Sequence, residues 1–140
     1  KNFKDEYLST SSLTISDIPE TYASALIAQG AFIDSQYKDK ALALEFYEKA
    51  VSMDEKSRKP YLALATYYTS VDDCKKVEKN VFKAIDLYPL DSISYFLLYH
   101  NYQFCFKDVS KAKEVIEKYK NLFKGDLFKD FKDYVKNISK

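Results

Sequence analysis

Glycine and proline are scarce in this chain: its 140 residues include 2 glycines and 3 prolines. Because tight turns draw on these residues, their scarcity disfavours a sandwich or barrel of many short strands and favours long helices. The sequence also lacks an apolar run near the roughly 20 residues that span a bilayer, and it shows no signal peptide. The sequence therefore predicts an all-α protein with no direct membrane insertion in this segment.

Charge of one sign is also lacking, since 22 basic and 21 acidic residues leave a net charge of +1. Lysine and aspartate alternate along the same segments, as in residues 129–133. This pattern is typical of solvated helix faces, whereas a nucleic-acid partner calls for a basic face. We therefore expect no nucleic-acid partner.

Cysteine and histidine are too few for a disulfide scaffold or a metal site. The 2 cysteines are Cys74 and Cys105, no CxxC occurs, and His100 is the single histidine. We expect two free thiols near helix ends; the alternative, a bridge between them, would imply an oxidising compartment. The cell envelope or periplasm and the cytoplasm both stay open, and analogy with domains excised from anchored proteins favours the envelope.

Motifs that carry catalysis are absent: the sequence has no GxxxxGK[ST], GxGxxG, HExxH or GxSxG. A Ser-His-Asp arrangement would have to use His100. The acidic pairs at 54–55 and 72–73 fall at expected helix ends, where capping explains them. We therefore expect no enzyme activity, no cofactor and no metal.

Aspartates mark the expected helix starts. Asp17, followed by Pro19 and Glu20, suits a capped first turn, and residues 1–15 before it are interpreted as a polar arm with a short turn around residues 3–8. Further helices are predicted after four aspartates, namely Asp72, Asp91, Asp108 and Asp126. Gly125 is expected to cap the C-terminal end of the helix that follows Asp108. Apolar residues of the last helix form one stripe that includes Phe128 and Phe131. The total is about seven helices.

Internal repetition decides the expected architecture. Three residues recur 34 positions later in the chain: Tyr61, Leu64 and Tyr68 are matched by Tyr95, Leu98 and Tyr102. Ala50 likewise recurs as Ala84. A large aromatic residue, a leucine three on and a tyrosine seven on share one helix face. One helix pair cannot bury such a face alone, so neighbouring pairs must stack.

These residues resemble the tetratricopeptide repeat (TPR) family, whose pattern is W-x2-L-G-x2-Y followed by A-x3-F-x2-A-x4-P. The middle repeat has Tyr61, Leu64, Ala65 and Tyr68, then Val77, Val81, Ala84 and Pro89. The repeats before and after it each carry one extra residue between their halves. They depart from the pattern at Gln29, Tyr99 and Tyr119.

The resemblance implies an all-α, TPR-like α-α superhelix of about seven antiparallel helices. Residues 16–140 would form a single helical-repeat domain, with repeats at about 22–56, 57–91 and 92–125 and a capping helix at 126–139. Such arrays bind a peptide or helix in the concave groove lined by the first helix of each pair. The groove residues would be Ile27, Ala31, Asp34, Leu62, Thr66, Thr69, Phe96, His100 and Gln103.

Two functions follow as hypotheses. The first is an adaptor or scaffold that binds a peptide or helix of another protein. The second is a structural or self-association segment of a larger, envelope-associated assembly, in which the stripe of the last helix caps its own core or docks on another chain. Leu62 and Phe96 are open to a second interpretation, because they would also suit packing against the arm or the last helix.

Overall fold

The computed structural model describes residues 18–138 as seven α-helices and two short π-helical segments, with no strand among them. The predicted all-α class is confirmed, and consecutive helices pack as antiparallel pairs. The chain divides into two compact units, the first up to Glu55 and the second from Lys56. The predicted arm at residues 1–15 and the cap at Asp17 lie outside the described residues.

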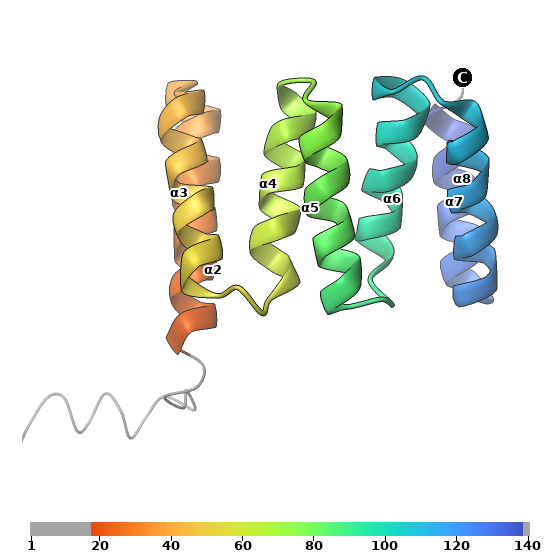
Figure 1. Ribbon diagram of the computed structural model, residues 1–140, viewed down its shortest axis with the longest axis horizontal. Helices are drawn as coiled ribbons and strands as arrows, with labels where there is room; N and C mark the ends of the chain where they lie inside the picture. Colours follow the sequence, from red (N-terminus) through yellow and green to blue (C-terminus); the bar gives the residue numbers. More distant parts are fainter. Residues whose placement is uncertain (1–17, 139–140) are drawn as a thin grey trace, which may run out of the picture. The chain divides into compact units, whose positions relative to one another are not determined.

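The first unit contains one helix pair, α2 (Ile18–Phe32) and α3 (Lys40–Met53), which run side by side in opposite directions (Figure 1). A π-helical segment, η2 (Ile33–Tyr37), extends α2. The buried core between the two helices contains Ala23, Leu26 and Ala50, with Ile27 and Phe46 packed against it.

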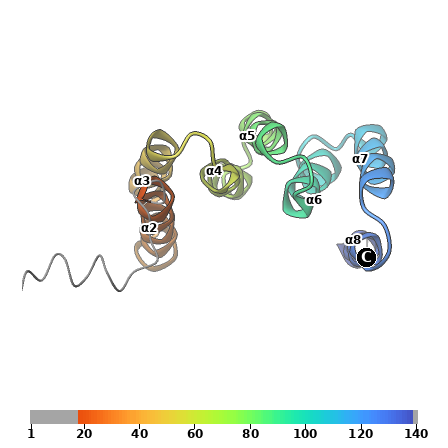
Figure 2. The same ribbon diagram turned by 90° about the horizontal axis from the view of Figure 1, so that it is seen from below.

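The second unit contains α4 (Arg58–Ser70), α5 (Cys74–Leu87), α6 (Ser92–His100), η3 (Asn101–Cys105), α7 (Val109–Leu122) and α8 (Asp126–Ile138). The pairs α4/α5 and α6/α7 pack within themselves, and α5 also packs against α6 and η3. Viewed along the helices, α4 and α6 lie on one side of this unit, α5 on the other, and α8 beside α6 (Figure 2). The first helices of the two pairs are therefore neighbours.

The turn inside each helix pair has the same construction. A residue with positive φ, at Lys38, Asp72 and Lys107, precedes an aspartate that caps the next helix. Asp39, Asp73 and Asp108 each accept a hydrogen bond from the backbone N–H three residues on, at 2.9, 3.2 and 3.0 Å. The turns are spaced by 34 and 35 residues. The helix predicted after Asp72 begins at Cys74; of the pair 72–73, Asp72 takes the left-handed position and Asp73 accepts the capping bond.

The two π-helical segments account for the extra residue in the outer repeats. Both lie at the end of the first helix of a pair, η2 after α2 and η3 after α6, whereas α4 ends without one. A π turn closes an i→i+5 hydrogen bond and so holds one more residue than an α turn. In η3 the N–H of Phe106 donates to the carbonyl of Asn101 at 2.9 Å. The insertion is therefore absorbed inside the helix, and the capped turn that follows is unchanged.

Gly30 lets α2 and α3 approach closely. A Cβ at this position would lie 2.9 Å from Cε1 of Tyr47, 3.2 Å from the carbonyl oxygen of Ala43 and 3.2 Å from Cβ of Phe46. Tyr47 is a buried ring on α3, so it has little room to move. The corresponding residue in the middle repeat is Ala65, which is also fully buried.

We expect Gly30→Ala to destabilise the first unit by about 1–3 kcal/mol through overpacking, even though alanine favours a helix by about 1 kcal/mol over glycine. The measurement is urea denaturation followed by circular dichroism. Gln29→Ala, a change at the exposed neighbour, is the control and should stay within about 0.5 kcal/mol. A Gly30→Ala protein more stable than the natural one would contradict the close packing.

Helix α8 closes the second unit with an aromatic cluster. Phe131 is 0% exposed and stacks on Phe96 at 5.0 Å and on Tyr119 at 4.3 Å between ring centroids. Tyr134 stacks on the same Phe96 ring at 5.1 Å. Tyr119, where the repeat pattern has alanine, is itself fully buried in this cluster. Phe131, a residue of the predicted stripe, therefore caps the chain's own core.

Cys74 and Cys105 form a disulfide, with their Cα atoms 5.6 Å apart. The expectation of two free thiols is wrong. Cys74 is the first residue of α5 and Cys105 the last of η3, so the bridge joins the start of one pair's second helix to the end of the next pair's first helix. The packing of α5 on η3 brings these two ends together.

Candidate functional site

The predicted groove residues of the first unit have different environments. Ile27 is half-buried against the core, and Ala31 is exposed. Asp34 pairs with Lys40, with the amine nitrogen 2.8 Å from a carboxylate oxygen. Since its charge is already balanced, Asp34 is a weak candidate for recognising a basic partner.

The remaining predicted residues belong to the second unit, where α4 and α6 neighbour each other. We call the set Leu62, Thr66, Thr69, His100 and Gln103 the α4–α6 surface. Thr66 is exposed, and the other four are half-buried. The hydroxyls of Thr66 and Thr69 donate to the carbonyls of Leu62 and Ala65, each at 2.9 Å. Their oxygens retain lone pairs that can accept from a partner.

Phe96, a predicted groove residue of α6, lies against another helix. Its ring stacks on those of Phe131 and Tyr134 of α8, at interplanar angles of 4° and 18°. Of the two interpretations from the sequence, packing against the last helix is the one observed. Next to it on the helix face, the His100 ring lies 4.9 Å from that of Phe104, which is 41% exposed. The α4–α6 surface is thus bounded by α8 and continues toward Phe104.

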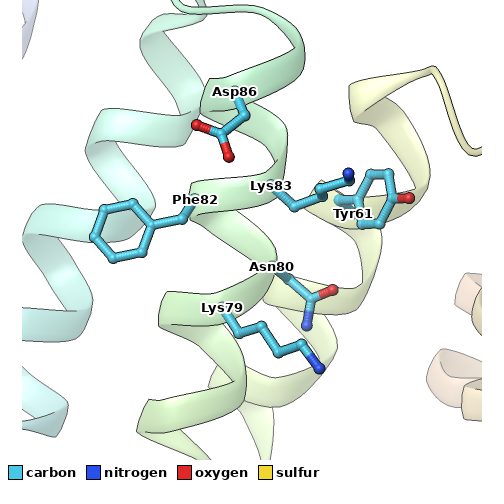
Figure 3. A pocket seen from close by; sticks show the side chains of 6 residues that line it. All are labelled: Tyr61, Lys79, Asn80, Phe82, Lys83 and Asp86. Atoms are coloured by element: carbon cyan, nitrogen blue, oxygen red, sulfur yellow. The ribbon is translucent and has the colours of Figure 1, made fainter.

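A shallow hollow lies between α4 and α5. It has a volume of about 320 Å³ and is lined by Tyr61, Lys79, Asn80, Phe82, Lys83 and Asp86. The Lys83 amine lies over the Tyr61 ring, 5.9 Å from its centroid, while Phe82 points to the other side of α5 (Figure 3). The amines of Lys79 and Lys83, the Asp86 carboxylate and the Asn80 amide surround the hollow and can form polar contacts with a ligand. Its lining contains no histidine or cysteine.

A second hollow, which we call the unit 1 groove, is apolar. It has a volume of about 480 Å³ and is lined by Ala28, Gln29, Phe32, Ile33, Tyr37 and Phe46. Phe32 and Tyr37 are 56% and 71% exposed, and their rings meet edge to face at 5.9 Å. None of the lining residues was among the predicted groove residues, because those were taken from another face of the same helix. The signal available was the excess of large apolar residues around 32–37.

Buried polar groups in the second unit are paired within the unit. The Tyr102 hydroxyl donates to Glu78 at 2.6 Å, and the Asn101 amide donates to the carbonyl of Cys74 at 2.9 Å. Burial, helped by the hydrogen bond to Glu78, raises the pKa of Tyr102 above its ordinary value. Burial likewise raises the pKa of Tyr119. Both tyrosines stay protonated at neutral pH, and Tyr102 serves as a structural donor.

Residues 18–138 contain neither a metal-binding cluster nor a membrane-spanning helix. That part of the chain contains no cluster of three or more histidine, cysteine or acidic side chains arranged to hold a metal ion. None of its helices is both long and apolar enough to cross a bilayer.

No protein-family model matches this chain, and no curated protein matches it either.

Proposed function

We propose that this chain is a TPR-type protein-interaction module that binds a helix or an extended peptide of a partner protein on the α4–α6 surface. The observation that carries the proposal is the recurring turn, a left-handed residue followed by a capping aspartate at spacings of 34 and 35 residues. This recurrence supports a repeat architecture in which the first helices of successive pairs share one surface.

The chemistry of the α4–α6 surface suits a peptide. Leu62 and Phe104 offer apolar contact, while Thr66 and Gln103 offer hydrogen-bonding groups, and none of these side chains is charged. Such a mixture favours partner segments with alternating apolar and polar side chains over strongly charged ones. We infer a binding module and not an enzyme, because the sequence carries no catalytic motif.

The disulfide bears on where the module acts. Disulfides form and persist in oxidising compartments, so the bridge between Cys74 and Cys105 supports the cell envelope or the extracellular side over the cytoplasm.

Site-specific cross-linking tests the proposed surface. A photoreactive residue is placed at Thr66 or Gln103, and, as matched controls, at Lys79 or Lys113 on the exposed faces of α5 and α7. After illumination in a lysate of the source organism, we expect the same partner peptide to be attached from positions 66 and 103 and not from the controls. Attachment only from positions 79 and 113 would refute the assignment.

A substitution without cross-linker gives the matching affinity test. Thr66→Glu adds a charge at an exposed position and should weaken binding of the partner identified in this way by about tenfold, since an unpaired carboxylate must be desolvated. The helical circular dichroism signal should be unchanged. Unaltered affinity would move the binding site away from α4.

A further inference from the structure

The unit 1 groove has a counterpart in the second unit. When the two pairs are aligned on their turns at Lys38 and Lys107, Phe32 corresponds to Asn101, Ile33 to Tyr102 and Phe46 to Val115. Both faces include a π-helical segment at the end of the first helix. The two faces therefore have the same backbone construction.

The counterpart face is covered. Asn101, Tyr102 and Val115 are 2%, 6% and 5% exposed. The cover is a helix, since α5 packs against both α6 and η3. Its Cys74 carbonyl and Glu78 carboxylate accept hydrogen bonds from Asn101 and Tyr102. The chain itself thus shows that an α-helix fits on this face of a helix pair.

The unit 1 groove has the same form but different chemistry. Phe32 and Ile33 replace the two hydrogen-bonding residues, and Phe32 is 56% exposed. A helix seated here has no side-chain donor at these two positions, so a glutamate like Glu78 would be buried without its hydrogen bond. An apolar side chain at that place would instead be favoured.

A second copy of the chain docking end to end is disfavoured. The outer face of its last helix is exposed and charged, with Lys129, Asp130, Lys132, Asp133 and Lys136. Burying these groups against Phe32 and Tyr37 would cost their hydration without any pairing. The buried ring of α8, Phe131, is already packed against Phe96 and Tyr119.

From these observations we propose that the unit 1 groove binds an amphipathic α-helix of a partner protein, which lies on α2 and η2 as α5 lies on α6 and η3. The partner helix presents an apolar stripe to Phe32, Ile33 and Phe46. This site is separate from the α4–α6 surface, and it stands whether or not that surface binds a peptide.

The test uses the full chain and a synthetic helical peptide of about 16 residues, with leucines at i, i+4, i+7 and i+11 and lysine and glutamate elsewhere. A scrambled peptide of the same composition is the control. Fluorescence anisotropy should show binding of the striped peptide and weaker binding of the scrambled one by at least about tenfold. Equal binding of both peptides, or of neither, would overturn the proposal.

Two variants locate the binding. Ala28→Glu places a charge in the groove at an exposed position and should lower the affinity for the striped peptide by at least about tenfold. Thr66→Glu on the α4–α6 surface should leave it unchanged, which separates this proposal from the preceding one. If Thr66→Glu lowers the affinity for the striped peptide and Ala28→Glu does not, the unit 1 groove is not the binding site.

A photoreactive phenylalanine analogue at Tyr37, on the groove rim, distinguishes the possible occupants. Attachment to the striped peptide supports a partner helix. Attachment to a second copy of the chain, or to another part of the same chain, in the presence of the peptide would overturn it. The same analogue at Tyr88, an exposed tyrosine of the second unit, should not attach the peptide.

Discussion

Replacing Phe131 by alanine is expected to destabilise the second unit by about 3–5 kcal/mol. The ring is fully buried and contacts three others, those of Phe96, Tyr99 and Tyr119, at centroid distances of 5.0, 5.8 and 4.3 Å. Its loss leaves a cavity between α6, α7 and α8 that these rings cannot fill without leaving their packed positions. Urea denaturation monitored by circular dichroism measures the effect.

The matched control is Phe82→Ala, which removes the same atoms from a ring that is 43% exposed. The free energy of unfolding of this variant should fall by about 1 kcal/mol or less, because much of the surface of the Phe82 ring already faces water. If the two variants lost the same stability, α8 would not cap the core. A larger loss for Phe82 would mean that the α5 face carries the packing instead.

Removing the disulfide should have an effect of similar size. The bridge closes a loop with a sequence separation of 31 residues, and the chain-entropy relation gives about 3–4 kcal/mol for a loop of this length. For a protein of this size that corresponds to a fall in Tm of roughly 10 °C. Thermal melts with and without reductant, alongside the Cys74→Ser/Cys105→Ser protein, give the measurement.

The double-serine protein is the internal control, because its melting temperature should be low and insensitive to reductant. The natural chain should match it only when reduced. If thiol labelling showed complete reduction and the Tm of the natural chain stayed the same, the bridge would make no contribution to stability.

The helix boundaries could be predicted because short-range chemistry sets them. An aspartate that accepts a backbone N–H acts within three residues, which is why Asp108 could be predicted from its neighbours. Asp39 caps α3 in the same way and was not predicted. The sequence did not separate Asp72 from Asp73, since either aspartate can cap a helix and only the left-handed φ at Asp72 distinguishes them.

The π-helical segments could be predicted only in part from the sequence. The extra residue in the outer repeats was visible in the spacing from Leu26 to Ala43 and from Tyr95 to Ala112. Spacing alone does not say whether an insertion lengthens the turn or the helix. The conserved geometry of the turn, with Lys38 and Lys107 at almost the same φ as Asp72, decides it in favour of the helix.

Long-range pairing could not be predicted. Cys74 and Cys105 are 31 residues apart in sequence, and their meeting depends on how α5 packs on η3. Phe96 had two apolar surfaces available to it, and only the three-dimensional placement of Phe131 and Tyr134 shows which one covers it. The unit 1 groove was missed for the same reason, because exposure is a property of neighbours that the local pattern does not contain.

The disulfide also matters to a chain that is pulled from its ends. Tension applied through the backbone passes from Cys74 to Cys105 across the sulfur atoms, so the residues between them carry none of it. About 100 Å of extended chain is thereby withheld from stretching, at roughly 3.3–3.6 Å per residue. This shielded loop contains helix α6 and most of α5. It also contains the hydrogen bond from Asn101 to Cys74. In an extended assembly under load, this segment would be the last to lengthen.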